Sequence, residues 1–210
     1  MNSNTKEILK RLDKAYGKEV RCYLTHDNAW QLLIAVILSA QCTDARVNTV
    51  TPALFKKYKD ARALGAAKLS DVERIIKPLG FFHSKARNII SCSKKIDEEF
   101  GGEVPRTIEE LTSLAGVGRK TANVIRGTIY GEPSVVVDTH VKRISKKLGF
   151  TKEDEPEKIE YELMKVLPKE YWIRYNTHII TLGRTICTAR NPDCENCFLR
   201  DVCPEGSGRR

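Results

Sequence analysis

The sequence lacks any hydrophobic run long enough to cross a membrane. Its longest apolar segment, AWQLLIAVILSA, ends at Ala40 and is well short of the about 20 residues that a spanning helix requires. The opening segment, MNSNTKEILKRLDKAYG, is polar and has no apolar core of the kind found in signal peptides. These absences argue against export and favour a cytoplasmic protein whose cysteines are reduced.

Signals for β-strands are also scarce. The longest β-branched run, Val135 to Val137, is too short to make a good strand. Helix signals recur instead, and the segment AWQLLIAVILSA is apolar on every side, which is typical of a fully buried helix. We therefore predict an all-α protein with about nine or ten helices.

Several helix boundaries can be read from capping residues. Asp27 or Asn28 can cap the buried helix that contains Trp30, and Thr107 with Glu110 forms a capping-box pattern. We also expect Ser70 or Asp71 to cap the helix in SDVERIIKPLGFF, and the helix in SKARNIISCSKKIDEEFGG to end at its glycine pair.

Negative charge is in deficit. Lys and Arg number 36 against 27 Asp and Glu, so the net charge is +9 at pH 7. This excess favours a polyanionic partner, with nucleic acid ahead of acidic membranes. With 210 residues, 41% of them hydrophobic, the chain can build one large domain or two small ones and is not intrinsically disordered.

Four of the seven cysteines crowd into one short segment. Their spacing is C-x6-C-x2-C-x5-C, at Cys187, Cys194, Cys197 and Cys203. Thiolates at this density in a reducing compartment indicate a metal site, and disulfides are the weaker alternative. Zinc sites usually pair two C-x2-C knuckles, so the single knuckle here slightly favours an iron–sulfur cluster over zinc. Arginines beside these cysteines, Arg190 among them, could contact phosphates or simply balance the thiolate charge.

The segment LAGVGRKTANVI predicts a tight turn between two helices. Gly116 and Gly118 carry no side chain to hold off a ligand, and Arg119 and Lys120 follow at once. Backbone N–H groups exposed together at a helix N-terminus form a phosphate site. A plain hairpin without a ligand is the alternative reading.

A second basic segment, DTHVKRISKKLGF, follows. It predicts a helix with an apolar face of Val141, Ile144 and Leu148, and four cations lie on the opposite arc. This arc could contact DNA or could be an ordinary solvated face. Asp138 stands at the start of the helix, where aspartate most often acts as an N-cap.

Taken together, LLIAVILSAQCTD, LAGVGRKTANV, VVDTHVKR and the cysteine pattern resemble the endonuclease III family of helix-hairpin-helix DNA glycosylases. The resemblance runs in order from Trp30 to Cys203. It implies two helical lobes with DNA between them: residues 23–133, a bundle of about six helices, and residues 1–22 with 134–210, which carry a [4Fe–4S] cluster. It further implies a monomeric enzyme of the nucleoid that excises oxidised or ring-damaged pyrimidines and then nicks the abasic strand.

The resemblance also assigns roles to individual residues. Lys120 corresponds to the nucleophile, Asp138 to the essential carboxylate, and the four clustered cysteines to the cluster ligands. Gln41 corresponds to the residue that fills the gap left by a flipped base, and Phe81 to a wedge on the opposite strand. The other DNA contacts that it implies are Gly116, Val117, Gly118, Arg119, Thr121, Arg143 and Arg190.

Two positions depart from the family pattern. Ala115 stands where the hairpin usually has proline, and Phe81 is bulkier than the usual aliphatic wedge. Two alternatives stay open at this point: a thymine- or adenine-mismatch glycosylase of the same superfamily, and a non-catalytic DNA-binding iron–sulfur module. Lys120 argues against the adenine enzymes, which usually lack a lysine there.

Overall fold

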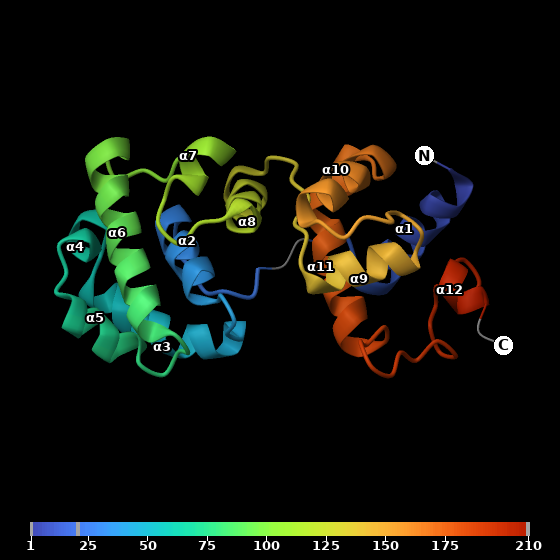
Figure 1. Ribbon diagram of the computed structural model, residues 1–210, viewed down its shortest axis with the longest axis horizontal. Helices are drawn as coiled ribbons and strands as arrows, with labels where there is room; N and C mark the ends of the chain where they lie inside the picture. The colour runs from blue at the N-terminus through green and yellow to red at the C-terminus, as the bar shows by residue number, and fades with distance from the viewer. Residues whose placement is uncertain (1, 20–21, 209–210) are drawn as a thin grey trace. The chain divides into compact units, whose positions relative to one another are not determined.

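The computed structural model describes residues 2–19 and 22–208 (Figure 1). Within these residues there are twelve α-helices, one short 3-10 helix (η1) and no β-strand, which confirms the all-α prediction. The helices outnumber the expectation because α4 (Ala61–Gly65) and α12 (Pro204–Ser207) are too short to show a helical period in the sequence.

The chain folds into two compact units. One is the continuous segment Cys22–Gly131, and the other combines Met1–Arg21 with Glu132–Arg210. Each unit has a hydrophobic core of its own. In the part of the chain that the structure describes, no helix is both long and apolar enough to cross a membrane.

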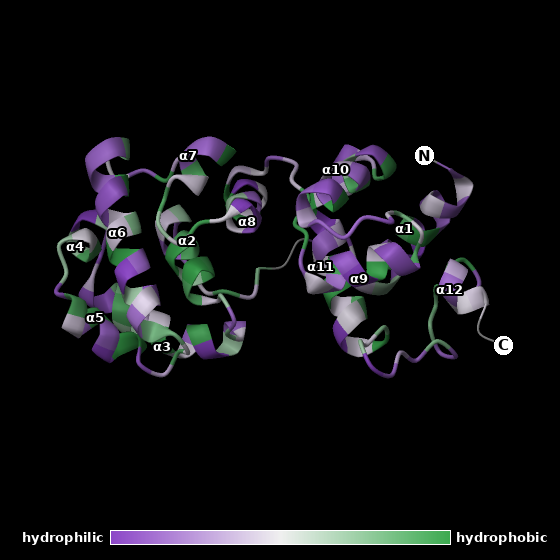
Figure 2. Cartoon of the chain, viewed as in Figure 1, coloured by the Kyte–Doolittle hydropathy of each residue, from purple (hydrophilic) through white to green (hydrophobic). Residues whose placement is uncertain are grey.

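The Cys22–Gly131 unit is built around α2 (Ala29–Leu38), where seven of the ten residues are buried. Figure 2 shows its hydrophobic character. Because α2 is apolar on every side, it can pack against α3, α6 and α8 at once. Besides α4, the unit contains α3 (Asp44–Lys57), α5 (Leu69–Ile76), α6 (Phe82–Phe100), α7 (Ile108–Thr112) and α8 (Arg119–Tyr130).

Most of the capping predictions in this unit are confirmed. The Asn28 side chain accepts a hydrogen bond of 2.9 Å from the N–H of Gln31 at the start of α2. Thr107 and Glu110 form both halves of a capping box on α7. α6 ends at Gly101 in a left-handed conformation, as the glycine pair predicted.

The predicted cap of α5 is wrong. The helix begins at Leu69 after Lys68, with no side-chain cap. Asp71 lies in the first turn and forms ion pairs with Arg74 and with Lys57 of α3, the latter at 3.0 Å. Its carboxylate is thus used between helices and within the turn, in place of capping.

The other unit contains α1 (Ser3–Tyr16), α9 (Thr139–Lys147), α10 (Pro156–Val166), η1 (Lys169–Tyr171), α11 (Trp172–Thr185) and α12. α11 packs on both α1 and α9. The α9–α11 contact depends on Gly183, where an added Cβ would lie 2.4 Å from Nδ1 of His140. Val135 to Val137 belong to an irregular segment before α9, and this agrees with the expectation that they form no strand.

Candidate functional site

The turn between α7 and α8 has the hairpin geometry that its glycines predict. Gly116 has a φ of +78°, a left-handed value that side chains rarely adopt. The N–H of Val117 then bonds to the carbonyl of Leu114 at 3.1 Å, and Val117 is buried. Gly118 is the N-cap of α8, and no side chain caps this helix. The N-terminus of α8, which no side chain caps, can therefore offer backbone N–H groups to an external acceptor such as phosphate.

Packing gives Gly116 a second reason to be glycine. An added Cβ would lie 3.0 Å from Cβ of Asn88 on α6 and 3.1 Å from Cγ2 of Ile37 on α2. The hairpin is thus seated against α6 and the C-terminal end of α2. Ala115, where the resemblance implies proline, does not prevent the turn from forming.

Lys120 stands in the first turn of α8, directly after the hairpin, with its side chain exposed. Arg119 and Thr121 flank it and are half-buried. The hairpin therefore places this amine at the N-terminus of α8, which no side chain caps.

Gln41 and Phe81 share an uncommon backbone conformation. Among the described residues, they are the two non-glycine positions with positive φ, at 54° and 56°. Such a residue is strained by about 1–3 kcal/mol, and strain of this kind concentrates at functional sites. Both side chains are exposed, and Phe81, at 67%, is the most exposed of the large hydrophobic side chains described.

The loops that carry these two residues are tied together. Arg46, in the first turn of α3, donates from Nε to the carbonyl of Pro78 at 2.8 Å. This bond links the start of α3, just after Gln41, to the loop before Phe81. The Cys22–Gly131 unit thus holds the hairpin, Gln41 and Phe81 on elements that pack around α2.

Asp138 is the N-cap of α9, as its position predicts. Its Oδ1 accepts a hydrogen bond of 2.8 Å from the N–H of Val141, and the residue is half-buried. Asp138 belongs to the unit that includes Glu132–Arg210, whereas Lys120 belongs to Cys22–Gly131.

The basic arc of α9 is engaged within its own unit. Lys142 and Lys146 both pair with Asp154, at 3.1 and 3.0 Å, and Lys147 pairs with Glu205 at 3.0 Å. Arg143 donates from Nη1 to the carbonyl of Thr188 at 3.4 Å and to Sγ of Cys187 at 3.7 Å. In this structure Arg143 therefore contacts the cysteine segment, and Arg190 lies exposed on the same segment.

The four clustered cysteines line one cavity. In a cubane cluster each of four thiolates binds a separate iron. Four cysteines that line one cavity supply that donor set and therefore fit an iron–sulfur cluster.

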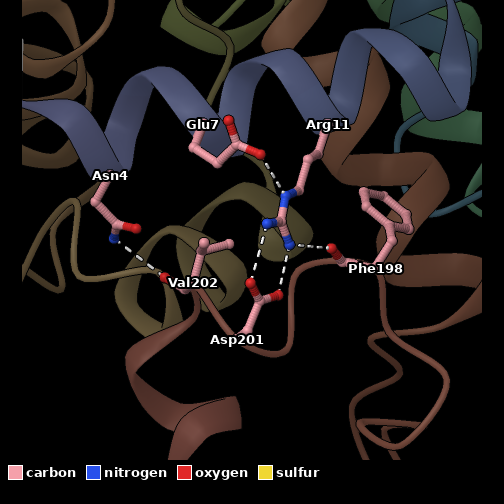
Figure 3. A network of polar contacts seen from close by, with 6 residues as sticks. All are labelled: Asn4, Glu7, Arg11, Phe198, Asp201 and Val202. Carbon is pink, nitrogen blue, oxygen red and sulfur yellow. Dashed lines mark hydrogen bonds and ion pairs between the residues drawn. The ribbon is translucent and has the colours of Figure 1, made fainter.

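The cysteine segment is fastened to α1 by polar contacts (Figure 3). The guanidinium of Arg11 binds both carboxylate oxygens of Asp201 and donates to the carbonyl of Phe198 at 2.9 Å. Glu7 supports the same guanidinium at 2.8 Å, and Asn4 donates to the carbonyl of Val202 at 3.1 Å. Hydrogen bonding to Asp201 and Glu7 raises the pKa of Arg11 above its usual value.

Two groups of site residues have no sequence motif that marks them. Arg11 and Arg46 donate hydrogen bonds to backbone carbonyls that lie far away in the sequence, at Phe198 and Pro78. Lys85 is only 4% exposed, although lysine is almost never buried. Its spacing from Ile89, Cys92 and Ile96 places it on the apolar face of α6, and this is the signal that could have found it.

Comparison with known proteins agrees with this geometry. Residues 34–169 match the HhH-GPD superfamily of base excision DNA repair proteins, and residues 187–203 match the iron–sulfur binding domain of endonuclease III. Endonuclease III of Synechocystis sp. is 50% identical over 94% of this chain and 90% of its own length. The Bacillus subtilis enzyme is 45% identical over 98% of this chain and 95% of its own length.

Solved structures give the same result. An endonuclease III in a non-covalent complex with DNA is 43% identical, with a TM-score of 0.91 over 100% of this chain and 99% of that one. A trapped covalent endonuclease III–DNA intermediate is 42% identical, with a TM-score of 0.90 over the same shares. A thermostable thymine-DNA glycosylase, 21% identical with a TM-score of 0.87 over 98% of each chain, shares the fold. The chain therefore belongs to the endonuclease III family of base-excision DNA glycosylases, within the HhH-GPD superfamily, and its cofactor is a [4Fe–4S] cluster.

Proposed function

We propose that this enzyme removes oxidised or ring-damaged pyrimidines from duplex DNA and then cuts the strand at the abasic site. The observation that carries the proposal is Lys120, an exposed amine in the first turn of α8, a helix whose N-terminus has no side-chain cap. A phosphate bound at that N-terminus would bring the neighbouring sugar within reach of the amine.

The proposed chemistry is covalent catalysis by Lys120. Its Nζ attacks C1′ of the sugar, the C1′–N bond to the base breaks, and the leaving base takes up a proton. Loss of a proton from nitrogen and opening of the sugar ring give a Schiff base. Removal of a C2′ proton then expels the 3′ phosphate by β-elimination. Water finally releases the lysine.

Asp138 would face the sugar as a negative charge. In that position it stabilises the positive charge that develops at C1′ and can accept the proton that Lys120 loses. We propose that both lobes contact the DNA, with residues 23–133 in one lobe and residues 1–22 and 134–210 in the other.

The remaining predicted contacts divide into two tasks. Gly116, Val117, Gly118, Arg119 and Thr121 would hold the backbone of the damaged strand, and Arg143 and Arg190 would contact phosphates from the cysteine segment. Gln41 would occupy the gap left by the flipped base, while Phe81 would wedge into the opposite strand. The strained backbone and exposed side chains of Gln41 and Phe81 support the second task.

We assign the cluster to Cys187, Cys194, Cys197 and Cys203, which line its cavity. When bound, the cluster cross-links the ends of the 187–203 segment. The chain's own contribution is to hold this segment rigid, so that Arg190 and the surrounding backbone keep one geometry toward DNA. We propose that the enzyme works in the cytoplasm, because thiolate ligands persist in a reducing compartment. We further propose that it acts there as a monomer on nucleoid DNA.

Replacing Arg11 with methionine is expected to loosen the cysteine segment. Methionine keeps the apolar stem but loses the fork that binds Asp201 and the carbonyl of Phe198. We expect the visible absorbance of the cluster to bleach severalfold faster in the presence of an iron chelator. Lys6→Met, an exposed substitution on the same helix, should bleach at the wild-type rate. Equal bleaching of Arg11→Met and wild type would contradict this anchoring role.

The proposed activity can be tested with a panel of duplexes. The holoenzyme is incubated, with and without borohydride, with duplexes that contain thymine glycol, an abasic site, a G·T mismatch or an A·G mismatch. We expect base release from thymine glycol and a borohydride-trapped adduct on both thymine glycol and the abasic site. Release from a mismatch alone would favour the mismatch glycosylase, and binding without any base release would favour the non-catalytic module.

A further inference from the structure

Lys85 is a buried cation without a hydrogen-bond partner. Its residue is 4% exposed, and its Nζ is one of the buried polar atoms of the described chain that make no hydrogen bond. Leaving an ammonium group in this state is costly, and such exceptions call for an explanation. The mechanism proposed above does not use this residue.

The backbone of Lys85 is bonded to the strained residue Phe81. Lys85 lies one turn into α6, and its N–H bonds to the carbonyl of Phe81 at 3.1 Å. Side chains in a helix lean toward the N-terminal turn, so the Lys85 stem extends toward the Phe81 end of α6. Burial lowers the pKa of Lys85, and the Coulombic interaction with Cys42, the residue that follows Gln41, acts in the opposite direction.

The C-terminal end of α2 lacks a cation of its own. No basic residue lies in its last turn, although the carbonyl end of a helix carries partial negative charge. In the described part of the chain, no backbone N–H donates to the carbonyl of Ala40 or Gln41. α6 packs against α2, and Asn88, one turn after Lys85, lies with Ile37 against the Gly116 hairpin. α6, which carries Lys85, thus packs on the helix that ends where the Gln41 loop begins.

We propose that Lys85 is a positioning residue for the Gln41 loop, residues 39–43. The charge of its buried ammonium, which makes no hydrogen bond, would act on the negative end of the α2 dipole and keep Gln41 in the left-handed conformation from which its side chain enters the DNA. The inference rests on the gap-filling role proposed for Gln41. It adds a buried cation that acts through Gln41 and touches neither DNA nor the reacting atoms.

The test compares two substrates that differ in their need for base extrusion. A paired thymine glycol must be flipped before reaction, whereas an abasic site has no base to extrude. For Lys85→Met, which has similar length and no charge, we expect thymine-glycol excision to fall about 10- to 100-fold in single turnover. Cleavage of the abasic site should change less than about threefold, and Lys85→Arg should recover most of the excision rate.

Lys94→Met is the matched control. Lys94 lies on the same helix, is exposed, and pairs only loosely with Glu98 at 3.7 Å, so both rates should equal those of the wild type. The ratio of the two rates separates positioning from stability, because a merely destabilised enzyme loses both activities together. If Lys85→Met does not fold, Lys85→Gln is measured in the same way.

A double-mutant cycle with Gln41→Ala completes the test. If Lys85 acts through Gln41, Lys85→Met should add no further loss in the Gln41→Ala background. Independent, multiplicative losses, or an unchanged ratio of the two rates in Lys85→Met, would overturn the inference. If Gln41→Ala excises thymine glycol at the wild-type rate, the proposed role of Gln41 fails. If Gln41→Ala loses excision but the Lys85 variants behave like wild type, only the inference about Lys85 fails.

Discussion

Replacing Lys120 with alanine is expected to abolish strand cleavage and to slow base release by roughly 10⁴-fold or more. The physical reason is that the amine both forms the bond to C1′ and remains attached during β-elimination. Without this amine the Schiff base cannot form, and the β-elimination that depends on the Schiff base cannot occur. Borohydride trapping on an abasic duplex and single-turnover base release measure the two losses separately.

Lys120→Arg provides the matched comparison. Arginine keeps a positive charge at the first turn of α8 but stays protonated and cannot form the Schiff base. We therefore expect DNA affinity close to that of the wild type and no trapped adduct. Trapping of the alanine or arginine variant at the wild-type level would remove Lys120 from the catalytic role.

Asp138→Asn is expected to lower base release by about 10²- to 10³-fold while leaving DNA binding and folding intact. Asparagine caps a helix as well as aspartate does, so it can replace the hydrogen bond to the N–H of Val141. The substitution therefore removes the negative charge and keeps the cap. The loss should appear in the rate constant at saturating DNA.

Asp138→Ala separates the two functions of this residue. It removes the cap as well and should lower the free energy of unfolding by about 1 kcal/mol. Thermal unfolding and a DNA-binding titration are measured for both variants. If Asp138→Asn loses as much stability as Asp138→Ala and no catalytic rate, Asp138 is a helix cap and nothing more.

Local pattern predicted much of the fold. The all-apolar segment became the buried helix α2, the Thr107–Glu110 box capped α7, and Gly101 ended α6. These features depend on interactions within one or two helical turns, which is the range that a sequence pattern reports. The cap of α5 was wrong because Asp71 pairs with Lys57 on another helix.

In the candidate site, too, the features within one short segment could be predicted from the sequence, and the contacts between distant segments could not. The hairpin with Lys120 and the four cysteines could be recognised from spacing, because each set lies within a single short segment. The pairing of Lys142 and Lys146 with Asp154 could not, and neither could the contact between Arg143 and the cysteine segment. These contacts join residues that come together only after the helices pack.

By itself, then, the sequence determined the helical class, the family, the hairpin, the nucleophile candidate and the metal-binding pattern. Only the tertiary structure decided that Gln41 and Phe81 adopt left-handed backbone, that Arg46 ties their loops together, and that Lys85 is buried. The physical reason is that strain and burial are set by neighbours from distant segments. From the sequence HSKA alone, Lys85 would be expected on the surface, and only the packed structure shows that it is buried.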